Sequence, residues 1–215
     1  MLGLLDARRV GKILCLGAHS DDIEIGCGGT ILRLIESRPD LCVYWVVFGA
    51  GEPHREMEAR RSAALFLKGA HEANVVIKNF RDSFFPFVGG EIKEQFEVLK
   101  KEFAPDLIFT HHDDDRHQDH RLISELTWNT YRDHTIMEYE IFKYDGDLGR
   151  PNVFSPLEEG TCRAKLQHLM ECFGTQTTRH WFTEDLFWAL LRLRGAEANS
   201  PTRYAEAFHC RKLML

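Results

Sequence analysis

The sequence predicts an α/β protein with a Rossmann-like, doubly wound and mostly parallel sheet that carries helices on both faces. Two observations predict this class. Strand-like and helix-like segments alternate four times between residues 12 and 131. The run at 41–48 (LCVYWVVF) is continuously apolar rather than alternating, as expected for a strand that is covered on both faces. A chain of 215 residues also favours one domain, which we place at 1–215 with a core at 10–145 and a less regular C-terminal part at 146–215.

The individual elements follow from apolar periodicity. Residues 12–17 form a short apolar run without a helical period, which predicts the first strand. Residues 30–36 place apolar side chains at helical spacing, and we interpret the glycine-rich segment 26–30 before them as a tight turn that also packs closely at the helix start. The other predicted core elements are strands at 41–48, 74–80 and 106–110 and helices at 56–68, 91–103 and 120–131. Towards the C-terminus we expect a strand at 139–144, a loop, and helices at 158–173 and 184–194.

Composition and charge exclude several classes of protein. The 27 Lys and Arg and the 33 Asp and Glu residues give a formal net charge of −6, so no basic surface is expected for nucleic acid or anionic lipid. The six cysteines are scattered without a CxxC pair, which predicts buried, reduced thiols. Residues 1–11 do not resemble a secretory signal, and the apolar run at 41–48 is too short to span a membrane. We therefore expect a cytoplasmic protein, and a homo-oligomer is left open.

Two polar clusters directly follow predicted strands. The segment 111–120 (HHDDDRHQDH) follows the fourth strand, contains no apolar residue and holds four of the 11 histidines. The cluster His19-Ser-Asp-Asp22 follows the first strand. In a doubly wound sheet the strand order commonly reverses beside the first strand, which places the carboxyl ends of the first and fourth strands next to each other. The two clusters should therefore face one crevice.

Histidine and aspartate together are typical ligands of a divalent metal ion. One His and one Asp from the first cluster, with one His from the second, make a set of two nitrogens and one carboxylate that suits Zn²⁺ with an open position for water. Fe²⁺ accepts the same set. A structural zinc site is usually closed by cysteine thiolates, and no cysteine pair accompanies these residues. The pattern therefore predicts a catalytic metal site.

The same residues carry a family resemblance. The stretch A-H-S-D-D-I-E-I-G-C-G-G-T at 18–30 resembles the A-H-P-D-D-x-E-x-x-x-G-G-T signature of the PIG-L or LmbE-like deacetylases, and D-x-H-x-D-H at 115–120 resembles their second signature. Ser20 and Gln118 stand where the family usually or often has Pro, a difference that bears on loop rigidity because Pro fixes φ. Weaker similarity, including Lys165 and Y-A-E-A-F at 204–208, extends over nearly the whole chain.

The resemblance implies a role for each residue of the site. The zinc ligands would be His19, Asp22 and His120. Asp21 would be the general base that takes a proton from the metal-bound water. His117, in its imidazolium form, would stabilise the oxyanion or protonate the leaving amine, with Asp119 tuning its charge. Glu24 and Asp115 would contact the ligand side chains and orient them without binding the ion themselves.

Other polar and aromatic residues lie outside the two signatures and are expected to contact the substrate or to replace a ligand. The resemblance implies that Arg55 and Asp82 bind the substrate. The aromatic stretch at 80–87 (FRDSFFPF) follows the third strand at the same sheet edge, so it could stack on a sugar or set specificity. His111 and His112 are alternatives to His120 as the third ligand.

The resulting hypothesis is a zinc-dependent amide hydrolase of the N-acetylglucosaminyl deacetylase type. It would remove an acetyl or small acyl group from the amine of an N-acetylated amino sugar or its conjugate by attack of zinc-bound water. Two alternatives remain: an amidase acting on another amide of an amino-sugar conjugate, and a non-catalytic metal-binding module. A dinucleotide site is disfavoured because the glycines at 26–29 do not complete a G-x-G-x-x-G frame, and the chain has no G-x-S-x-G nucleophile elbow.

Overall fold

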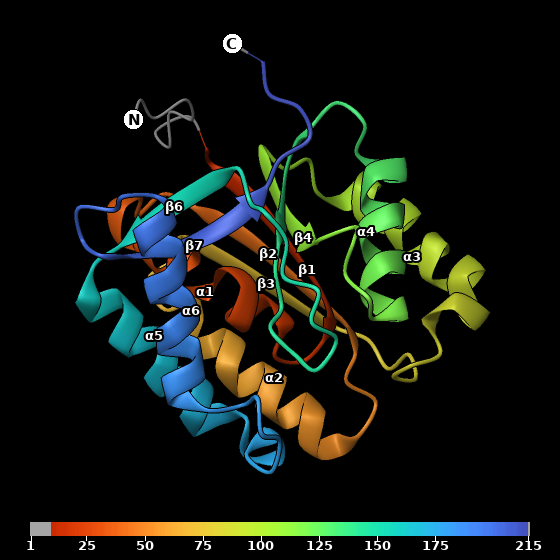
Figure 1. The fold of residues 1–215 in the computed structure, drawn as a ribbon. Coiled ribbons are helices and arrows are strands. Elements are labelled where there is room, and N and C mark those ends of the chain that lie inside the picture. The colour runs from red at the N-terminus through yellow and green to blue at the C-terminus, as the bar shows by residue number, and fades with distance from the viewer. Residues whose placement is uncertain (1–9, 215) are drawn as a thin grey trace.

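Figure 1 shows the strands joined in one mixed sheet; this computed structural model describes residues 10–214. The strands of that described part are β1 (Lys12–His19), β2 (Cys42–Gly49), β3 (Glu72–Ile77), β4 (Leu107–His111), β5 (Thr135–Tyr139), β6 (Val153–Leu157) and β7 (Tyr204–His209). Their order is β3-β2-β1-β4-β5-β7-β6. Strands β1 to β5 run parallel, and β7 is antiparallel to both of its neighbours. The mostly parallel sheet predicted from the sequence is confirmed.

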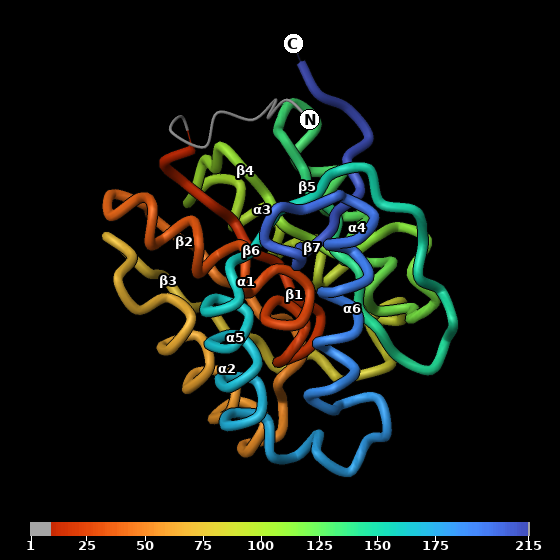
Figure 2. Tube along the Cα trace, turned by 60° about the vertical axis from the view of Figure 1, so that its left-hand side comes forward, coloured from red at the N-terminus to blue at the C-terminus, as the bar shows by residue number. Residues whose placement is uncertain are grey.

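Helices cover both faces of this sheet (Figures 1 and 2). One face carries α1 (Asp22–Ser37), α2 (Pro53–Phe66), α5 (Glu159–Cys172) and α6 (Glu184–Glu197). The other face carries α3 (Gly89–Glu102) and α4 (Gln118–Thr130). Two 3₁₀ helices, η2 (Phe85–Val88) and η3 (Gly174–Gln176), lie in the connections before α3 and after α5. The expected doubly wound arrangement is therefore present.

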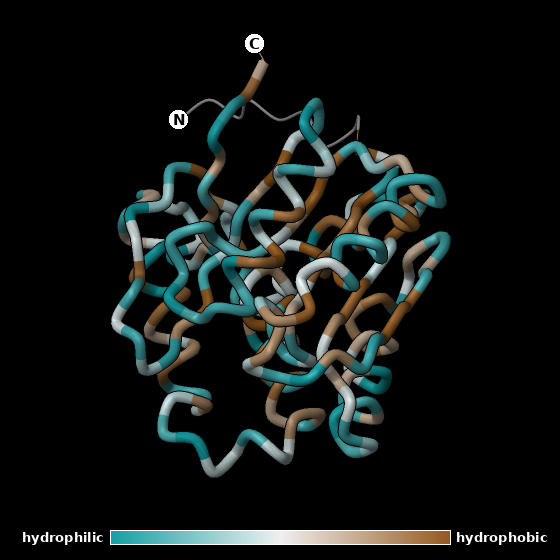
Figure 3. Tube along the Cα trace, turned by 90° about the vertical axis from the view of Figure 1, so that its right-hand side faces the viewer, coloured by the Kyte–Doolittle hydropathy of each residue, from teal (hydrophilic) through white to brown (hydrophobic). Residues whose placement is uncertain are grey.

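A hydrophobic core lies on each side of the sheet. In β1, Ile13 and Cys15 belong to the core under α1, while Leu14 and Leu16 belong to the core under α3 and α4. Because both faces of the strand are covered, residues 13–16 are all apolar and buried, and no alternation appears in the sequence. Figure 3 shows most of the hydrophobic, brown segments inside and many hydrophilic, teal segments along the outline.

The glycine-rich segment 26–30 is helical and not a turn, because α1 already begins at Asp22. The expected close packing is present. A Cβ on Gly26 would clash with the ring of Tyr139, and a Cβ on Gly28 would lie 2.5 Å from the Phe66 ring. These glycines let α1 approach its neighbours, so the prediction of a turn was wrong and the prediction of close packing is confirmed.

The C-terminal part adds two strands that the sequence analysis missed. Strands β6 and β7 extend the sheet beyond β5, and α5 and α6 pack beside α1 and α2. The strand signal in the sequence is weak at both places, because β6 contains Pro156 and β7 contains the charged Glu206, and both residue types are uncommon in sheets. The strand expected at 139–144 lies earlier in the sequence. It is β5, which ends at Tyr139.

Three expectations from composition concern the chain as a whole. Within residues 10–214, no helix combines the length and apolarity needed to cross a membrane. The six cysteines are free, and all but Cys42 are buried, as expected. The expectation about a secretory signal rests mainly on residues 1–9, which lie outside the described residues.

Candidate metal centre

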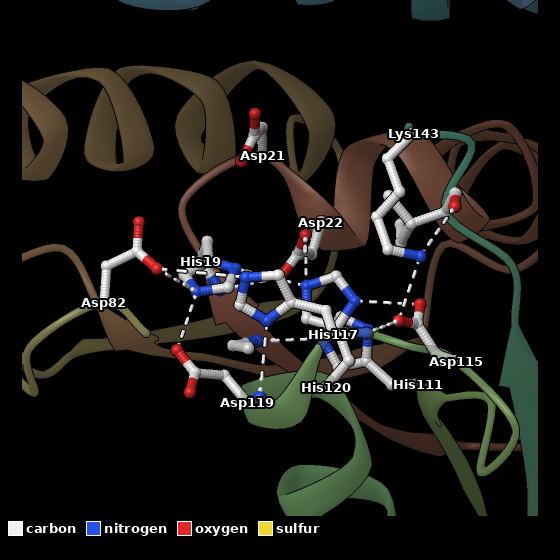
Figure 4. Close-up of polar contacts among 12 residues, drawn as sticks. His19, Asp21, Asp22, Asp82, His111, Asp115, His117, Asp119, His120 and Lys143 are labelled. Atoms are coloured by element: carbon white, nitrogen blue, oxygen red, sulfur yellow. Dashed lines mark hydrogen bonds and ion pairs between the residues drawn. The ribbon is translucent and has the colours of Figure 1, made fainter. Parts of the chain in front are cut away.

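The two polar clusters meet because β1 and β4 are neighbours in the sheet. Cys15 of β1 pairs with Phe109 of β4, so the carboxyl ends of both strands lie at the same edge. His19 is the last residue of β1, and Asp22 is the first residue of α1. His120 lies in the first turn of α4. Figure 4 shows these side chains pointing toward one another, as the sequence predicted.

The candidate ligand atoms have the spacing of a metal site. His19 Nδ1 lies 3.1 Å from His120 Nε2 and 3.4 Å from Asp22 Oδ2, and the other Asp22 oxygen lies 3.5 Å from His120 Nε2. A tetrahedral ion with bonds of about 2.0–2.1 Å separates its ligand atoms by about 3.3–3.4 Å. Asp22 with His111 and His120, and His19 with His117 and His120, each form a group whose ligand atoms lie within 4.8 Å of one another, so the donors around His120 can hold a divalent ion such as Zn²⁺.

Each ligand is held from behind by a second group. Asp115 Oδ2 lies 2.9 Å from His120 Nδ1, which leaves Nε2 toward the centre. Asp119 Oδ2 lies 3.2 Å from His19 Nε2, which leaves Nδ1 toward the centre. Asp22 Oδ2 accepts a 2.6 Å hydrogen bond from the His19 backbone N–H. Carboxylates behind ligating imidazoles are typical of metal sites.

The charges in the centre favour a cation. Burial opposes ionisation of Asp22, but His120, His111 and His19 hold its pKa well below the usual range. Burial, reinforced by His111, lowers the pKa of His120 to about 3. Burial opposes protonation of His19, but Asp22 and Asp119 raise its pKa well above the usual value. The carboxylates thus stabilise a positive charge on His19, whereas His120 stays neutral and keeps a lone pair on Nε2.

The alternatives to His120 have other partners. His111 Nε2 accepts a 2.9 Å hydrogen bond from the Ala18 backbone N–H, which uses the lone pair that a metal would need. Its ring stacks on His120 at 3.9 Å between centroids. The Nδ1 of His112 lies 2.7 Å from Glu138. These contacts favour His120 as the third ligand.

Asp21, the expected general base, lies directly before α1 and is buried. Its Oδ1 accepts a 3.0 Å bond from Arg55, which also binds Glu58 at 3.2 Å. Burial raises the pKa of Asp21 although Arg55 opposes the shift, and Asp22 raises it further. Arg55 therefore contacts the Asp21 carboxylate, and its contact with substrate stays a prediction.

His117 is placed as a hydrogen-bond donor to the site. Its Nδ1 accepts the backbone N–H of Asp119 at 3.3 Å, so the neutral ring carries its proton on Nε2. Burial and the nearby charge of His19 lower its pKa, although Asp119 opposes the shift. The structure thus favours a neutral donor rather than the imidazolium expected from the sequence. The Asp119 carboxylate acts mainly on His19 and on the loop before η2.

Asp82 and Glu24 differ in their relation to the centre. Asp82 Oδ1 lies 3.2 Å from His19 Nε2, and its side chain is 69% exposed. It therefore lies at the mouth of the site, where a substrate hydroxyl could reach it. Glu24 is wholly buried, with the Ser62 hydroxyl as its nearby polar side chain. Burial raises its pKa well above the usual value, and it holds no candidate ligand.

Lys143 is a site residue that the sequence analysis missed. Its Nζ lies 2.9 Å from Asp115 Oδ1 and 2.6 Å from Asp147 Oδ2 (Figure 4). Asp147 also accepts the Arg116 backbone N–H at 2.8 Å. Lys143 thereby ties the loop after β5 to the carboxylate that holds His120. An isolated lysine in an irregular loop carries no sequence signal for this role.

A buried ion pair that was also missed holds α1 in place. Glu206 of β7 accepts the backbone N–H groups of Gly29 and Thr30 at 2.8 and 2.7 Å. Lys165 of α5 lies 2.6 Å from both Glu206 and the Ile25 carbonyl oxygen. The helix that carries Asp22 is therefore bonded to the C-terminal part of the chain.

Asp115→Asn is expected to weaken metal binding about 10–100-fold, because the carboxylate behind a ligating imidazole orients the ring and raises its basicity. The measurement is zinc affinity by competition with a chromophoric chelator. Asp114→Asn is the control, since Asp114 is exposed in the same loop. An unchanged affinity in the Asp115 variant would show that this carboxylate does not support a ligand.

A mostly parallel sheet with such a cluster of candidate ligands at the carboxyl edge of its parallel strands, beside a buried carboxylate and an imidazole donor, is typical of metal-dependent hydrolases. The chain belongs to the PIG-L family, described as GlcNAc-PI de-N-acetylase, whose sequence model matches residues 14–131. It is thus a member of a deacetylase family, as the two sequence signatures predicted.

Relatives of the chain are consistent with this assignment. YaiS of Escherichia coli K12, named an uncharacterized deacetylase, is 32% identical over 135 residues, which are 58% of this chain and 70% of that protein. The N,N'-diacetylchitobiose deacetylase of Pyrococcus horikoshii is 23% identical and has a TM-score of 0.69, covering 94% of this chain and 84% of that one. GalB of Pseudomonas putida KT2440, a 4-carboxy-2-hydroxymuconate hydratase, is 15% identical with a TM-score of 0.73 over 95% and 97%. The structural similarities confirm the fold, which also serves a hydratase.

Proposed function

We propose that the protein is a zinc-dependent hydrolase that removes an acetyl or similar small acyl group from the amine of an N-acetylated amino sugar or its conjugate. The observation that carries the proposal is the convergence of His19 Nδ1 and His120 Nε2, 3.1 Å apart, with the Asp22 carboxylate, whose Oδ2 lies 3.4 Å from His19 Nδ1 and whose Oδ1 lies 3.5 Å from His120 Nε2. The family adds the acetylated sugar as substrate class. Fe²⁺ is the alternative ion, since it accepts the same ligands.

His19, Asp22 and His120 would hold the ion. When bound, it would act as a Lewis acid on the amide carbonyl and lower the pKa of an attacking water. Asp21, buried and with a raised pKa, would accept a proton from that water and return it to the leaving nitrogen. Addition of the water oxygen to the carbonyl carbon and cleavage of the C–N bond give acetate and a free amine.

Two further groups would position the reaction. His117 Nε2–H would donate to the oxygen on which negative charge develops, a contact worth about 2.7–4 kcal/mol in other enzymes. Arg55 would hold the Asp21 carboxylate in place through their 3.0 Å contact. Asp82, largely exposed beside His19, would accept hydrogen bonds from sugar hydroxyls. This arrangement supports a polar sugar ring at the mouth of the site and its acetamide at the centre.

Metal analysis combined with an amine-release assay tests the proposal. We expect about one zinc per chain, release of free amine from a member of a panel of N-acetylated sugars, loss of release after chelation, and recovery when Zn²⁺ is returned. Release that persists after complete chelation would contradict metal dependence. Metal binding without hydrolysis of any amide would instead favour a non-catalytic metal-binding module.

A further inference from the structure

An aromatic surface faces solvent directly beside the candidate metal centre. Phe87 is 80% exposed and Phe84 is 38% exposed, and their ring centroids lie 5.8 Å apart. Phe85 in the same segment is fully buried. The guanidinium of Arg81 lies 3.7 Å from the centroid of the Phe84 ring. We call Arg81, Phe84 and Phe87 the aromatic ledge; adjoining exposed aromatic side chains of this kind often mark a binding surface.

The aromatic ledge is held firmly to the centre by Asp119, which is wholly buried. Asp119 Oδ2 accepts the Ser83 backbone N–H at 2.6 Å, and Oδ1 accepts the Phe85 N–H at 3.1 Å. Asp119 thereby holds the Asp82–Ser83 and Phe84–Phe85 peptide groups, and the Phe84 N–H between them donates to the Arg81 carbonyl oxygen at 3.2 Å. Ser83 has a φ of 67°, a left-handed conformation that a residue other than glycine adopts at a cost and that stays in place only when its surroundings enforce it. The aromatic ledge is therefore preorganised relative to His19, which Asp119 also contacts.

Asp82 shows which part of a substrate would reach the aromatic ledge. Its carboxylate lies 3.2 Å from His19 Nε2, and Phe84 follows two residues later. This step rests on the proposed function, in which the acetamide lies at the metal and the sugar hydroxyls face Asp82. A group linked to the sugar would then lie against Phe84 and Phe87. Flat apolar rings bind alkyl or aryl groups better than they bind water or free hydroxyls.

We propose that the aromatic ledge binds an apolar aglycone, so that the preferred substrate is an N-acetylated amino sugar linked to an alkyl or aryl group rather than the free sugar. The test compares octyl and methyl glycosides of N-acetylglucosamine, with the octyl glycoside kept below its micelle concentration. The variants are Phe84→Ser/Phe87→Ser and, as a matched control, Val98→Ser/Leu193→Ser. Val98 and Leu193 are 46% and 48% exposed on α3 and α6.

We expect the native protein to have a kcat/KM at least about tenfold higher for the octyl glycoside, since burial of about two methylene groups suffices for that preference. The Phe84→Ser/Phe87→Ser variant should lose this preference because its kcat/KM for the octyl glycoside falls towards its value for the methyl glycoside, while the control keeps the native preference. An equal preference in the native protein and the Phe variant would overturn the proposal. So would sedimentation showing that the Phe substitutions dissociate an oligomer while the preference is unchanged.

A binding measurement separates failure of this proposal from failure of the proposed function. If neither glycoside is hydrolysed, the deacetylase proposal fails, and the aromatic ledge is tested with octyl β-D-glucoside, which has no amide. Titration calorimetry on the full chain should then show binding that the Phe84→Ser/Phe87→Ser variant weakens at least about fivefold and the control does not, because the alkyl chain loses its apolar contact. Equal binding by all three proteins would overturn the assignment of the aromatic ledge.

Discussion

Asp21→Asn is expected to lower kcat for amine release about 10²–10⁴-fold, the contribution of a general base, with metal content unchanged. Asparagine has nearly the same size and can still face Arg55, but its amide cannot accept a proton from water. The neighbouring ligand Asp22 is untouched. The measurement pairs steady-state kinetics with metal analysis of the same preparation.

The control for this prediction is Asp133→Asn, which removes a carboxylate whose side chain is 90% exposed on a loop before β5. That variant should keep its activity and its metal. If Asp21→Asn retained more than half of the native kcat, Asp21 would not be the base. If Asp21→Asn lost the metal together with the activity, its carboxylate would instead belong to the ligand set.

His120→Gln is expected to remove metal binding at working concentrations. The loss in affinity should exceed the roughly 10–100-fold effect of removing a supporting carboxylate, because a ligand itself is lost. Amine release should disappear with the metal. Glutamine keeps a polar group toward Asp115, which limits the cost of burying that carboxylate without a partner. Zinc affinity by chelator competition and circular dichroism of the same sample separate loss of metal from loss of fold.

His111→Gln provides the sharpest comparison, because His111 is the stacked neighbour of His120 and its Nε2 already accepts the Ala18 N–H. We expect this variant to keep its metal, since a glutamine oxygen can accept the same hydrogen bond. His71→Gln, on an exposed loop residue, is the control for histidine substitution in general. Loss of metal in His111→Gln with retention in His120→Gln would reverse the assignment of the third ligand.

The convergence of His19, Asp22 and His120 could be predicted because its determinants are local. His19 and Asp22 follow a continuously apolar strand, and His120 follows another by a short polar loop, so the placement of each depends on a few neighbouring residues. Only one long-range assumption was needed, the adjacency of the first and fourth strands, and it follows from the general topology of doubly wound sheets. The pairing of Cys15 with Phe109 confirms that assumption.

The supporting groups could not be predicted because their roles arise from long-range contacts. Lys143 reaches Asp115 across 28 positions, and Glu206 reaches Gly29 across 177. The preference of His117 for a neutral ring depends on burial and on the Asp119 backbone, and neither is visible in the sequence. Strand β7 was missed for the same reason. Glu206 weakens the strand signal of β7 in the sequence, but in the fold it is buried and accepts backbone N–H groups of α1.

The central claim is that His19, Asp22 and His120 bind one divalent ion, and anomalous diffraction from crystals of the zinc-loaded protein tests it most directly. The predicted result is a single strong peak about 2.0–2.2 Å from His19 Nδ1, His120 Nε2 and an Asp22 oxygen. A peak coordinated by His111 in place of His120 would contradict the claim. So would an ion held only by His112, Asp113 and Glu138, the separate group of possible ligands beside β5.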